Sequence, residues 1–149
     1  YLRALTDSYI FYKVDRYDIK GRQYLKTLGK YYLVDTGIHN LLRSGSAADT
    51  GHLIENVVFL ELLHRGAKVN IGKLAEKEVD FVATEGNEVT YYQVSASVLD
   101  ESTMKRELKP LQQIPDHHPK ILLTLDEIGA GANYDGIRQL NLINWLLEK

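Results

Sequence analysis

The sequence contains no cysteine. This absence excludes disulfide bonds, zinc–thiolate sites, iron–sulfur clusters and catalysis by a thiol. The sequence also has no apolar run close to the roughly 18 residues that a membrane-spanning helix needs. We therefore expect no membrane contact and a cytoplasmic location.

A phosphate-binding loop is also missing. The segment from Gly66 to Lys73 is the nearest match, but five residues separate its two glycines where the motif has four. Leu74 stands where the motif has the Ser or Thr that would hold Mg²⁺. We expect no ATP site and no other organic cofactor in this chain.

What remains has the composition of a globular domain. The chain has 149 residues, of which 44% are hydrophobic and 26% charged, and a mass of 17.0 kDa. This length suffices for one domain with a buried core. The chain starts at Tyr1 rather than Met, in the middle of a pattern, so we expect it to be a part of a longer protein.

The net charge of −2 is unevenly distributed. Residues 1–50 hold eight Lys/Arg against five Asp/Glu (+3), residues 51–100 four against eight (−4), and residues 101–149 six against seven (−1). Seven of the ten tyrosines precede residue 33, interleaved with the basic residues. This mixture suits phosphate contact and base stacking, and it also suits a tyrosine-rich hairpin with a solvated basic face. The candidate nucleic-acid contacts are Lys13, Arg16, Lys20, Arg22 and, on a later helix, Arg106.

The first 45 residues are predicted to form a short connector. Leu2 to Ser8 has the pattern of a helix end, and Tyr9 to Tyr17 alternates as a strand does. A turn at Ile19 to Arg22 would return the chain as a strand over Gln23 to Leu28. Further elements are a strand at Lys30 to Val34 and a helix at Ile38 to Leu42. The Ser-, Ala- and Gly-rich segment from Arg43 to Gly51 is the predicted boundary, with the main domain over residues 46–149.

The main domain is predicted to be α/β. His52 to His64 is apolar around most of its circumference, which indicates a buried helix that ends at Gly66. A second helix opens at Asp100-Glu101, and Ile128 to Gly136 is a loop. From residue 52 the predicted order is α-β-β-β-α-β. The predicted strands are Lys68 to Ile71, Glu78 to Ala83, Val89 to Ala96 and Lys120 to Leu125, and a last helix covers Leu142 to Leu147.

The order of elements and several short motifs resemble a known family. An acidic residue in the first helix (Glu55) and another in the second strand (Asp80) are typical of the PD-(D/E)XK, or restriction-endonuclease-like, fold. Several short sequence segments are similar to those of the domain of unknown function 4143 family. The matching segments are Lys30 to Gly37, Gly51 to Asn56, Glu78 to Phe81, Tyr92 to Ser95, Arg106 to Leu111 and Asn141 to Leu147.

This resemblance implies a mixed sheet flanked by helices, preceded by a remnant of a winged-helix-like or β-hairpin segment. It also implies an AAA-type ATPase module on the N-terminal side, which would bind the ATP and act as a partner of this domain. In active nucleases of this fold, acidic side chains hold Mg²⁺ or Mn²⁺ and a lysine helps to activate the attacking water. The resemblance places these roles at Glu55, Asp80, Gln93 and Ser95, with Glu55, Asp80 and Gln93 as the metal ligands.

The alternation of side chains along strands tests this placement. Glu78, Asp80 and Val82 would share one face of their strand, with Val79 and Phe81 on the other. In the next strand Gln93 and Ser95 would share a face. Asp80 and Gln93 would then lie side by side beneath the helix that carries Glu55.

The residue types depart from the active pattern. Gln93 stands where a carboxylate is expected and Ser95 where a lysine is expected, and loss of one such group typically lowers the rate by about 10²- to 10⁴-fold. A basic residue from elsewhere could replace the missing lysine, and the candidates are Lys73, Lys77, Lys105 and Arg106. Each acidic candidate could instead be structural, because a buried carboxylate such as Glu55 needs a partner of some kind.

Three functions are compatible with these residues. The first is an accessory domain of an ATP-binding protein, with a degenerate nuclease-like site, that contacts nucleic acid or a protein partner. The second is a Mg²⁺- or Mn²⁺-dependent DNA endonuclease. The third is a docking or self-association domain.

Overall fold

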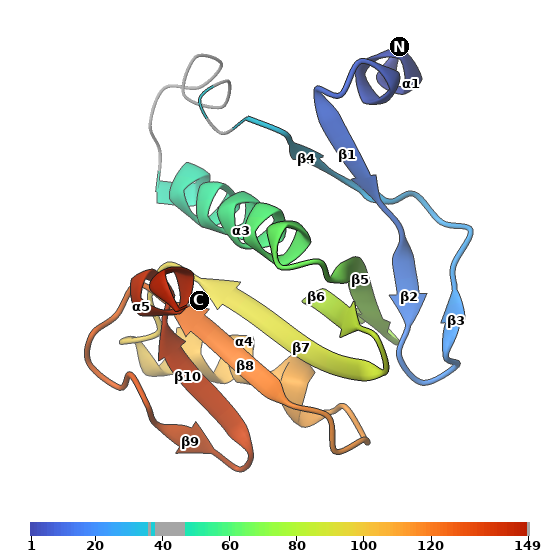
Figure 1. Cartoon of the computed structure of the whole chain (residues 1–149). Coiled ribbons are helices and arrows are strands. Elements are labelled where there is room, and N and C mark those ends of the chain that lie inside the picture. Colours follow the sequence, from blue (N-terminus) through green and yellow to red (C-terminus); the bar gives the residue numbers. More distant parts are fainter. Residues whose placement is uncertain (36, 38–46, 149) are drawn as a thin grey trace.

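The computed structural model describes residues 1–35, 37 and 47–148. Within these residues, an eight-stranded mixed β-sheet runs through the centre of the molecule (Figure 1). The strand order is β3-β2-β5-β6-β7-β8-β10-β9. β5, β6 and β7 are antiparallel neighbours, β8 runs parallel to β7, and β10 runs parallel to β8. The bounds are β2 Arg16–Asp18, β3 Gln23–Tyr24, β5 Lys68–Leu74, β6 Lys77–Glu85, β7 Glu88–Ser95, β8 Lys120–Thr124, β9 Asn133–Tyr134 and β10 Ile137–Asn141.

Helices cover both faces of this sheet (Figure 1). α3 (Ala47–His64) and α5 (Leu142–Leu147) pack on one face, which we call the α3 face, and α4 (Glu101–Gln112) packs on the other, the α4 face. Successive strand residues enter the two layers alternately, so that Tyr92 lies in the core beneath α3 and Tyr91 in the core beneath α4. The α/β class and the order α-β-β-β-α-β are confirmed.

The helix ends follow the local sequence. Asp100 caps α4, because its carboxylate accepts a hydrogen bond from the Thr103 N–H at 2.9 Å. Gly66 follows α3 with φ +87°, a conformation that glycine adopts without steric strain. Pro110 lies in the last turn of α4, which ends two residues later.

The N-terminal strand was predicted wrongly as one element. Past α1 (Leu2–Asp7), β1 (Phe11–Val14) pairs with β4 (Lys30–Leu33) in a separate two-stranded sheet. β2 instead joins the large sheet, antiparallel to β3 and parallel to β5. Asp15 lies between β1 and β2, and its carbonyl accepts a hydrogen bond from the Ile71 N–H on β5 at 3.1 Å. The predicted turn between β2 and β3 is present, but β3 has only two residues.

Two predictions fall partly or wholly outside the described residues. These are the helix at residues 38–42 and the domain boundary after residue 45. Residues 47–51, which we expected in a linker, belong to α3. None of the helices in the described part of the chain is both long enough and apolar enough to span a membrane.

Candidate functional site

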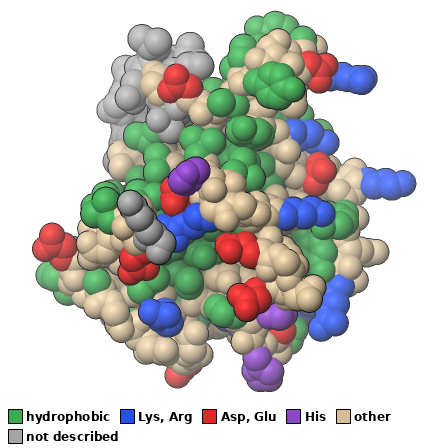
Figure 2. Space-filling view, in the orientation of Figure 1, with side chains coloured by type: hydrophobic (Ala, Val, Ile, Leu, Met, Phe, Trp, Pro, Cys, Tyr) green, Lys and Arg blue, Asp and Glu red, His purple; other side chains and the backbone are tan. Residues whose placement is uncertain are grey.

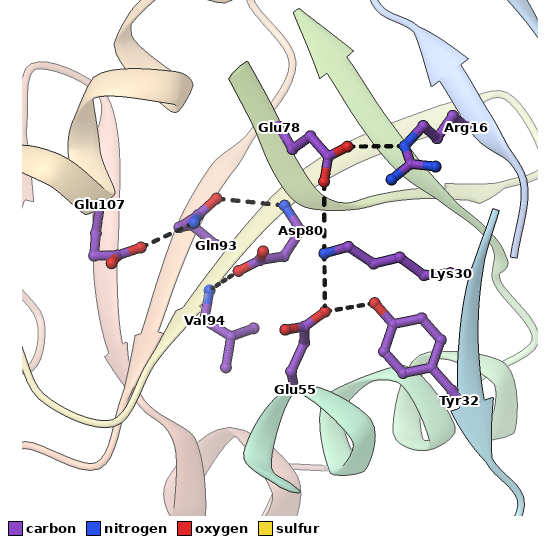
Figure 3. Close-up of polar contacts among 9 residues, drawn as sticks. All are labelled: Arg16, Lys30, Tyr32, Glu55, Glu78, Asp80, Gln93, Val94 and Glu107. Atoms are coloured by element: carbon purple, nitrogen blue, oxygen red, sulfur yellow. Dashed lines mark hydrogen bonds and ion pairs between the residues drawn. The ribbon is translucent and has the colours of Figure 1, made fainter. Parts of the chain in front are cut away.

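The ladder between β6 and β7 stops before the strands end, and two side chains continue it. Regular pairing runs from Glu85 and Glu88 as far as Phe81 and Tyr92. Beyond that point, Asp80 Oδ2 accepts a hydrogen bond from the Val94 N–H at 2.8 Å (Figure 3). Gln93 Oε1 accepts one from the Asp80 N–H at 3.3 Å. Asp80 and Gln93 are therefore neighbours, as predicted, but the Gln93 side chain turns to Glu107 on α4 and does not lie beneath the helix that carries Glu55.

A β-bulge in β6 determines which face each side chain reaches. Asn70 lies opposite Val82 and Gly72 lies opposite Val79, so β6 has one more residue than β5 between these pairs. The extra residue interrupts the alternation of faces. Val79 and Val82 both lie in the core beneath α4, whereas Phe81 packs beneath α3. The predicted placement of Val79 and Val82 on opposite faces is therefore wrong.

Glu55 points from α3 toward β4 and has two partners there. The Tyr32 hydroxyl donates to Glu55 Oε1 at 2.5 Å, and Lys30 Nζ lies 3.3 Å from the same oxygen (Figure 3). Lys30 and Tyr32 share a face of β4 because they are two residues apart. Asn56 fixes β4 on α3, since its side-chain amide donates to the Leu33 carbonyl at 2.9 Å and accepts from the Leu33 N–H at 2.8 Å.

Lys30 lies between two carboxylates. Its Nζ is 3.3 Å from Glu55 Oε1 and 3.7 Å from Glu78 Oε2, while Arg16 Nε donates to Glu78 Oε1 at 2.8 Å (Figure 3). Burial alone would raise the pKa of Glu78. The Arg16 hydrogen bond and the positive charges of Lys30, Arg16 and Lys73 outweigh it, so that this pKa lies below its ordinary value.

Asp80 lies in the opposite electrostatic situation. Burial, followed by the negative charge of Glu55, raises the pKa of Asp80 to about 7, although the Val94 N–H and the charge of Lys30 oppose the shift. Burial and Glu55 also raise the pKa of the Tyr32 hydroxyl above its ordinary value. A carboxyl group that titrates near neutral pH is typical of functional sites, where it can bind, give or accept a proton.

Glu55, Glu78 and Asp80, with Lys30 between them, form what we call the carboxylate cluster. Gln93 connects this cluster to α4. Its Nε2 donates to Glu107 Oε2 at 2.9 Å, and Glu107 Oε1 is paired with Arg106 Nη2 at 2.9 Å (Figure 3 shows the contact between Gln93 and Glu107). Both polar ends of the buried Gln93 side chain are therefore engaged, one by the Asp80 backbone and one by Glu107.

Ser95 does not join the site. Its hydroxyl donates to the Ser97 carbonyl at 3.0 Å, at the end of β7. Lys30 is the cation that lies beside Glu55 and Glu78. This role was not predicted from the sequence, and neither were the roles of Tyr32, Glu78 and Glu107. The available signal was the spacing of Lys30 and Tyr32 on one short strand.

The residues proposed to replace the missing lysine lie elsewhere. Lys105 pairs with Glu101 at 2.5 Å on the exposed side of α4, and Arg106 pairs with Glu107. Lys77 lies beside Lys109, whose charge lowers the pKa of Lys77 in addition to the effect of burial. Lys73 alone affects the cluster, through its charge on Glu78.

The predicted metal ligands do not form a ligand set. Glu55 and Asp80 approach each other, but the oxygen of Gln93 faces the Asp80 N–H. Within residues 1–35, 37 and 47–148, no three His, Asp or Glu side chains converge closely enough to hold a metal ion. As placed, these residues do not fit a three-ligand Mg²⁺ or Mn²⁺ site.

Two of the five candidate nucleic-acid contacts lie in an exposed turn and three are paired. Lys20 and Arg22 are exposed between β2 and β3. Lys13 pairs with Asp15 at 3.2 Å, Arg16 with Glu78 and Arg106 with Glu107. Figure 2 shows Lys and Arg side chains along the side of the molecule on which β1–β3 lie.

A basic pocket opens beside the carboxylate cluster. It has a volume of about 670 Å³. Three cationic side chains and one carboxylate line it, namely Arg16, Lys26, Lys73 and Glu78, together with Leu25, Thr27 and Leu28. Arg16 and Glu78 belong to both the pocket and the cluster, so a ligand in the pocket would lie next to Lys30.

The chain is similar to a longer bacterial protein. It is 38% identical over 148 residues to an uncharacterized protein of Haemophilus influenzae. The match covers 99% of this chain and 36% of the relative, so the chain spans about a third of the length of that protein. No protein-family profile matches the sequence. No solved structure matches it either.

Proposed function

We propose that this chain is a nucleic-acid-binding domain that contacts backbone phosphates without hydrolysing them efficiently. The observation that carries the proposal is the basic pocket, in which three cations face one carboxylate. Phosphate contacts from Lys and Arg supply most of the affinity of sequence-independent binding. The pocket is large enough for a backbone segment, because ligand sites usually enclose about 300–1,000 Å³.

The carboxylate cluster supports binding better than hydrolysis. Gln93 is hydrogen-bonded at both ends, and Ser95 lies outside the cluster. Lys30 is paired with Glu55 and Glu78. Its ammonium group therefore neutralises the negative charge that a bound metal ion would neutralise in an active nuclease. The cluster thus anchors β4 and Arg16 beside the basic pocket.

We also propose that the domain has the restriction-endonuclease-like fold and works as an accessory domain of a larger AAA-type ATP-binding protein. The approach of Glu55, on the first helix of the main domain, to Asp80, on its second strand, supports this proposal, because the resemblance to the domain of unknown function 4143 family assigns both residues to one site. The relative is longer than this chain and has room for a further module.

The binding proposal is tested by fluorescence anisotropy with labelled duplex and single-stranded DNA at several salt concentrations. The double variant Lys26→Ala/Lys73→Ala is expected to weaken binding by about 10-fold and to reduce the slope of log K against log salt by about 2, since each lost phosphate contact reduces it by about 1.

Lys105→Ala/Arg138→Ala is the matched control, because it removes two exposed positive charges far from the pocket. It should bind as the unmodified chain does. Equal weakening by the two double variants would contradict a defined site, and no binding by the unmodified chain would refute the proposal.

The approach of Glu55 and Asp80, two of the three predicted metal ligands, favours a second function, a metal-dependent endonuclease. Incubation with supercoiled plasmid and Mn²⁺ distinguishes the two. Nicking that Asp80→Ala abolishes would establish the endonuclease and refute binding without cleavage. We expect plasmid that remains supercoiled.

A further inference from the structure

A second pocket lies on the α4 face, away from the carboxylate cluster. It has a volume of about 370 Å³ and is formed where the turn between β2 and β3 meets β6, β7 and the segment before β8. Its lining includes three tyrosines and three charged or titratable side chains: Tyr17, Tyr24, Tyr91, Arg22, Asp116 and His118. None of these residues contributes to the basic pocket.

Aromatic side chains form a large part of the wall of this pocket. Tyr17 and Tyr24 pack edge to face, with ring centroids 5.4 Å apart. Tyr91 is 3% exposed, and the rest of the lining consists of the apolar Ile19, Val82 and Val89 and the polar Asn70 and Thr84. Aromatic side chains of this kind offer surfaces on which a planar ring can stack.

The rim of the pocket is polar and its groups are held in place. The Tyr91 hydroxyl donates a hydrogen bond to Asp116 Oδ2 at 2.6 Å. The backbone N–H of His118 donates one to Asp116 Oδ1 at 3.1 Å. These contacts orient the carboxylate while leaving it lone pairs for a further donor. Among the residues that the structure describes, Arg22 has no ion pair, and its charge is close enough to lower the pKa of Tyr91 against the larger effects of burial and Asp116.

We propose that this pocket binds one nucleotide unit. The base lies against the tyrosines, an amino group of the base donates to Asp116, and the phosphate contacts Arg22. The volume is at the lower end of the range for ligand sites, about 300–1,000 Å³, which suits one base with its sugar. This site is independent of the basic pocket, because the two share no residue.

The nucleotide unit could be free or could belong to a single strand, and calorimetry with different probes distinguishes these sources. The probes are AMP, adenosine, ribose 5-phosphate and a 12-residue single-stranded oligonucleotide. AMP that binds more tightly than adenosine and ribose 5-phosphate assigns the site to a free nucleotide. Oligonucleotide binding that Tyr24→Ala weakens, without binding of AMP, assigns the site to an unpaired base in a strand, and absence of both refutes the pocket.

Variants show whether binding occurs at this pocket. Tyr24→Ala and Arg22→Ala are each expected to raise the Kd of the bound probe by about 10-fold, within the range for loss of one stacking partner. Tyr31→Ala and Arg138→Ala are the matched controls, because both residues lie outside this pocket and outside the basic pocket. They should leave the Kd of AMP unchanged.

Tyr24 is 55% exposed and Arg22 is exposed, so all four variants should keep the thermal midpoint of the unmodified chain. Unchanged binding in both Tyr24→Ala and Arg22→Ala would overturn the proposal. Loss of duplex binding in Lys26→Ala/Lys73→Ala, with AMP binding retained, would separate the two sites.

Discussion

Replacement of Asp80 by Asn is expected to stabilise the protein by about 2 kcal/mol at pH 8 and to leave its stability almost unchanged at pH 4. The pKa of Asp80 is raised from 3.8 to about 7, so the folded state holds this proton more tightly than the unfolded state does. Each unit of pKa is worth about 1.4 kcal/mol, which sets an upper limit of about 4 kcal/mol. We expect about half of this limit, because relaxation and water entry around an ionised Asp80 lower the cost of the buried charge.

The sign follows from the proton that each state binds. Between pH 3.8 and about 7 the folded state binds more protons than the unfolded state, so stability falls as pH rises through this window. Below the window Asp80 is neutral in both states, and the raised pKa has no effect. The side chain introduced by Asp80→Asn has no proton to lose, and its amide oxygen can still accept from the Val94 N–H.

Urea unfolding of both proteins at pH 4, 6 and 8 measures this effect, because the difference between the two curves cancels the titration of other groups. Asp7→Asn is the control, since Asp7 is exposed at the end of α1 and should show no such difference. A less stable Asp80→Asn variant at pH 8 would show that the ionised carboxylate is favourably partnered and would remove the argument for a functional acid.

The elements with a simple sequence signal were predicted well. The helix around Glu55 is apolar on most sides, and the strands around Asp80 and Gln93 are separated by glycine turns. Asp100 begins α4 as a capping residue, and Asn141 begins α5 by accepting from the Asn144 N–H at 3.1 Å. These signals are local, because each depends on residues within one or two turns of the chain.

β10 was missed for the opposite reason. The central residue of β10, Gln139, is 1% exposed. Its Nε2 donates a hydrogen bond to Thr124 Oγ1 on β8 at 3.2 Å. A buried amide weakens the apolar pattern that marks a buried strand, and its partner lies 15 residues away in the sequence. The strand is therefore specified by a tertiary contact that the local pattern does not contain.

The same limitation affected the site. The approach of Asp80 to Gln93 could be predicted, because both lie on adjacent strands of one hairpin. The contribution of Lys30 could not, since it depends on β4 packing on α3 through the hydrogen bonds of Asn56. The bulge in β6 was equally hidden, because uninterrupted alternation gives no sign of an extra residue.

Lys30 is the central cation of the carboxylate cluster, so its removal should have a large effect. Lys30→Met is expected to lower the free energy of unfolding by about 2 kcal/mol at pH 8, between the small effect of breaking a surface pair and the about 3–5 kcal/mol for a buried one. Its ammonium is shared by Glu55 and Glu78 and also lowers the pKa of Asp80. Without it, three carboxylates repel one another in a partly buried cluster.

Two further measurements identify repulsion as the cause. At pH 5 the loss should shrink, because removal of the Lys30 charge raises the pKa values of Glu78 and Asp80, which then take up protons. The double variant Lys30→Met/Glu55→Gln should recover part of the lost stability at pH 8, since one of the repelling charges is then absent. Lys13→Met is the matched control, because the pair between Lys13 and Asp15 is exposed on both sides and should contribute under about 1 kcal/mol. Equal losses in Lys30→Met and Lys13→Met would show that Lys30 is an ordinary surface cation, and the carboxylate cluster would then have no electrostatic centre.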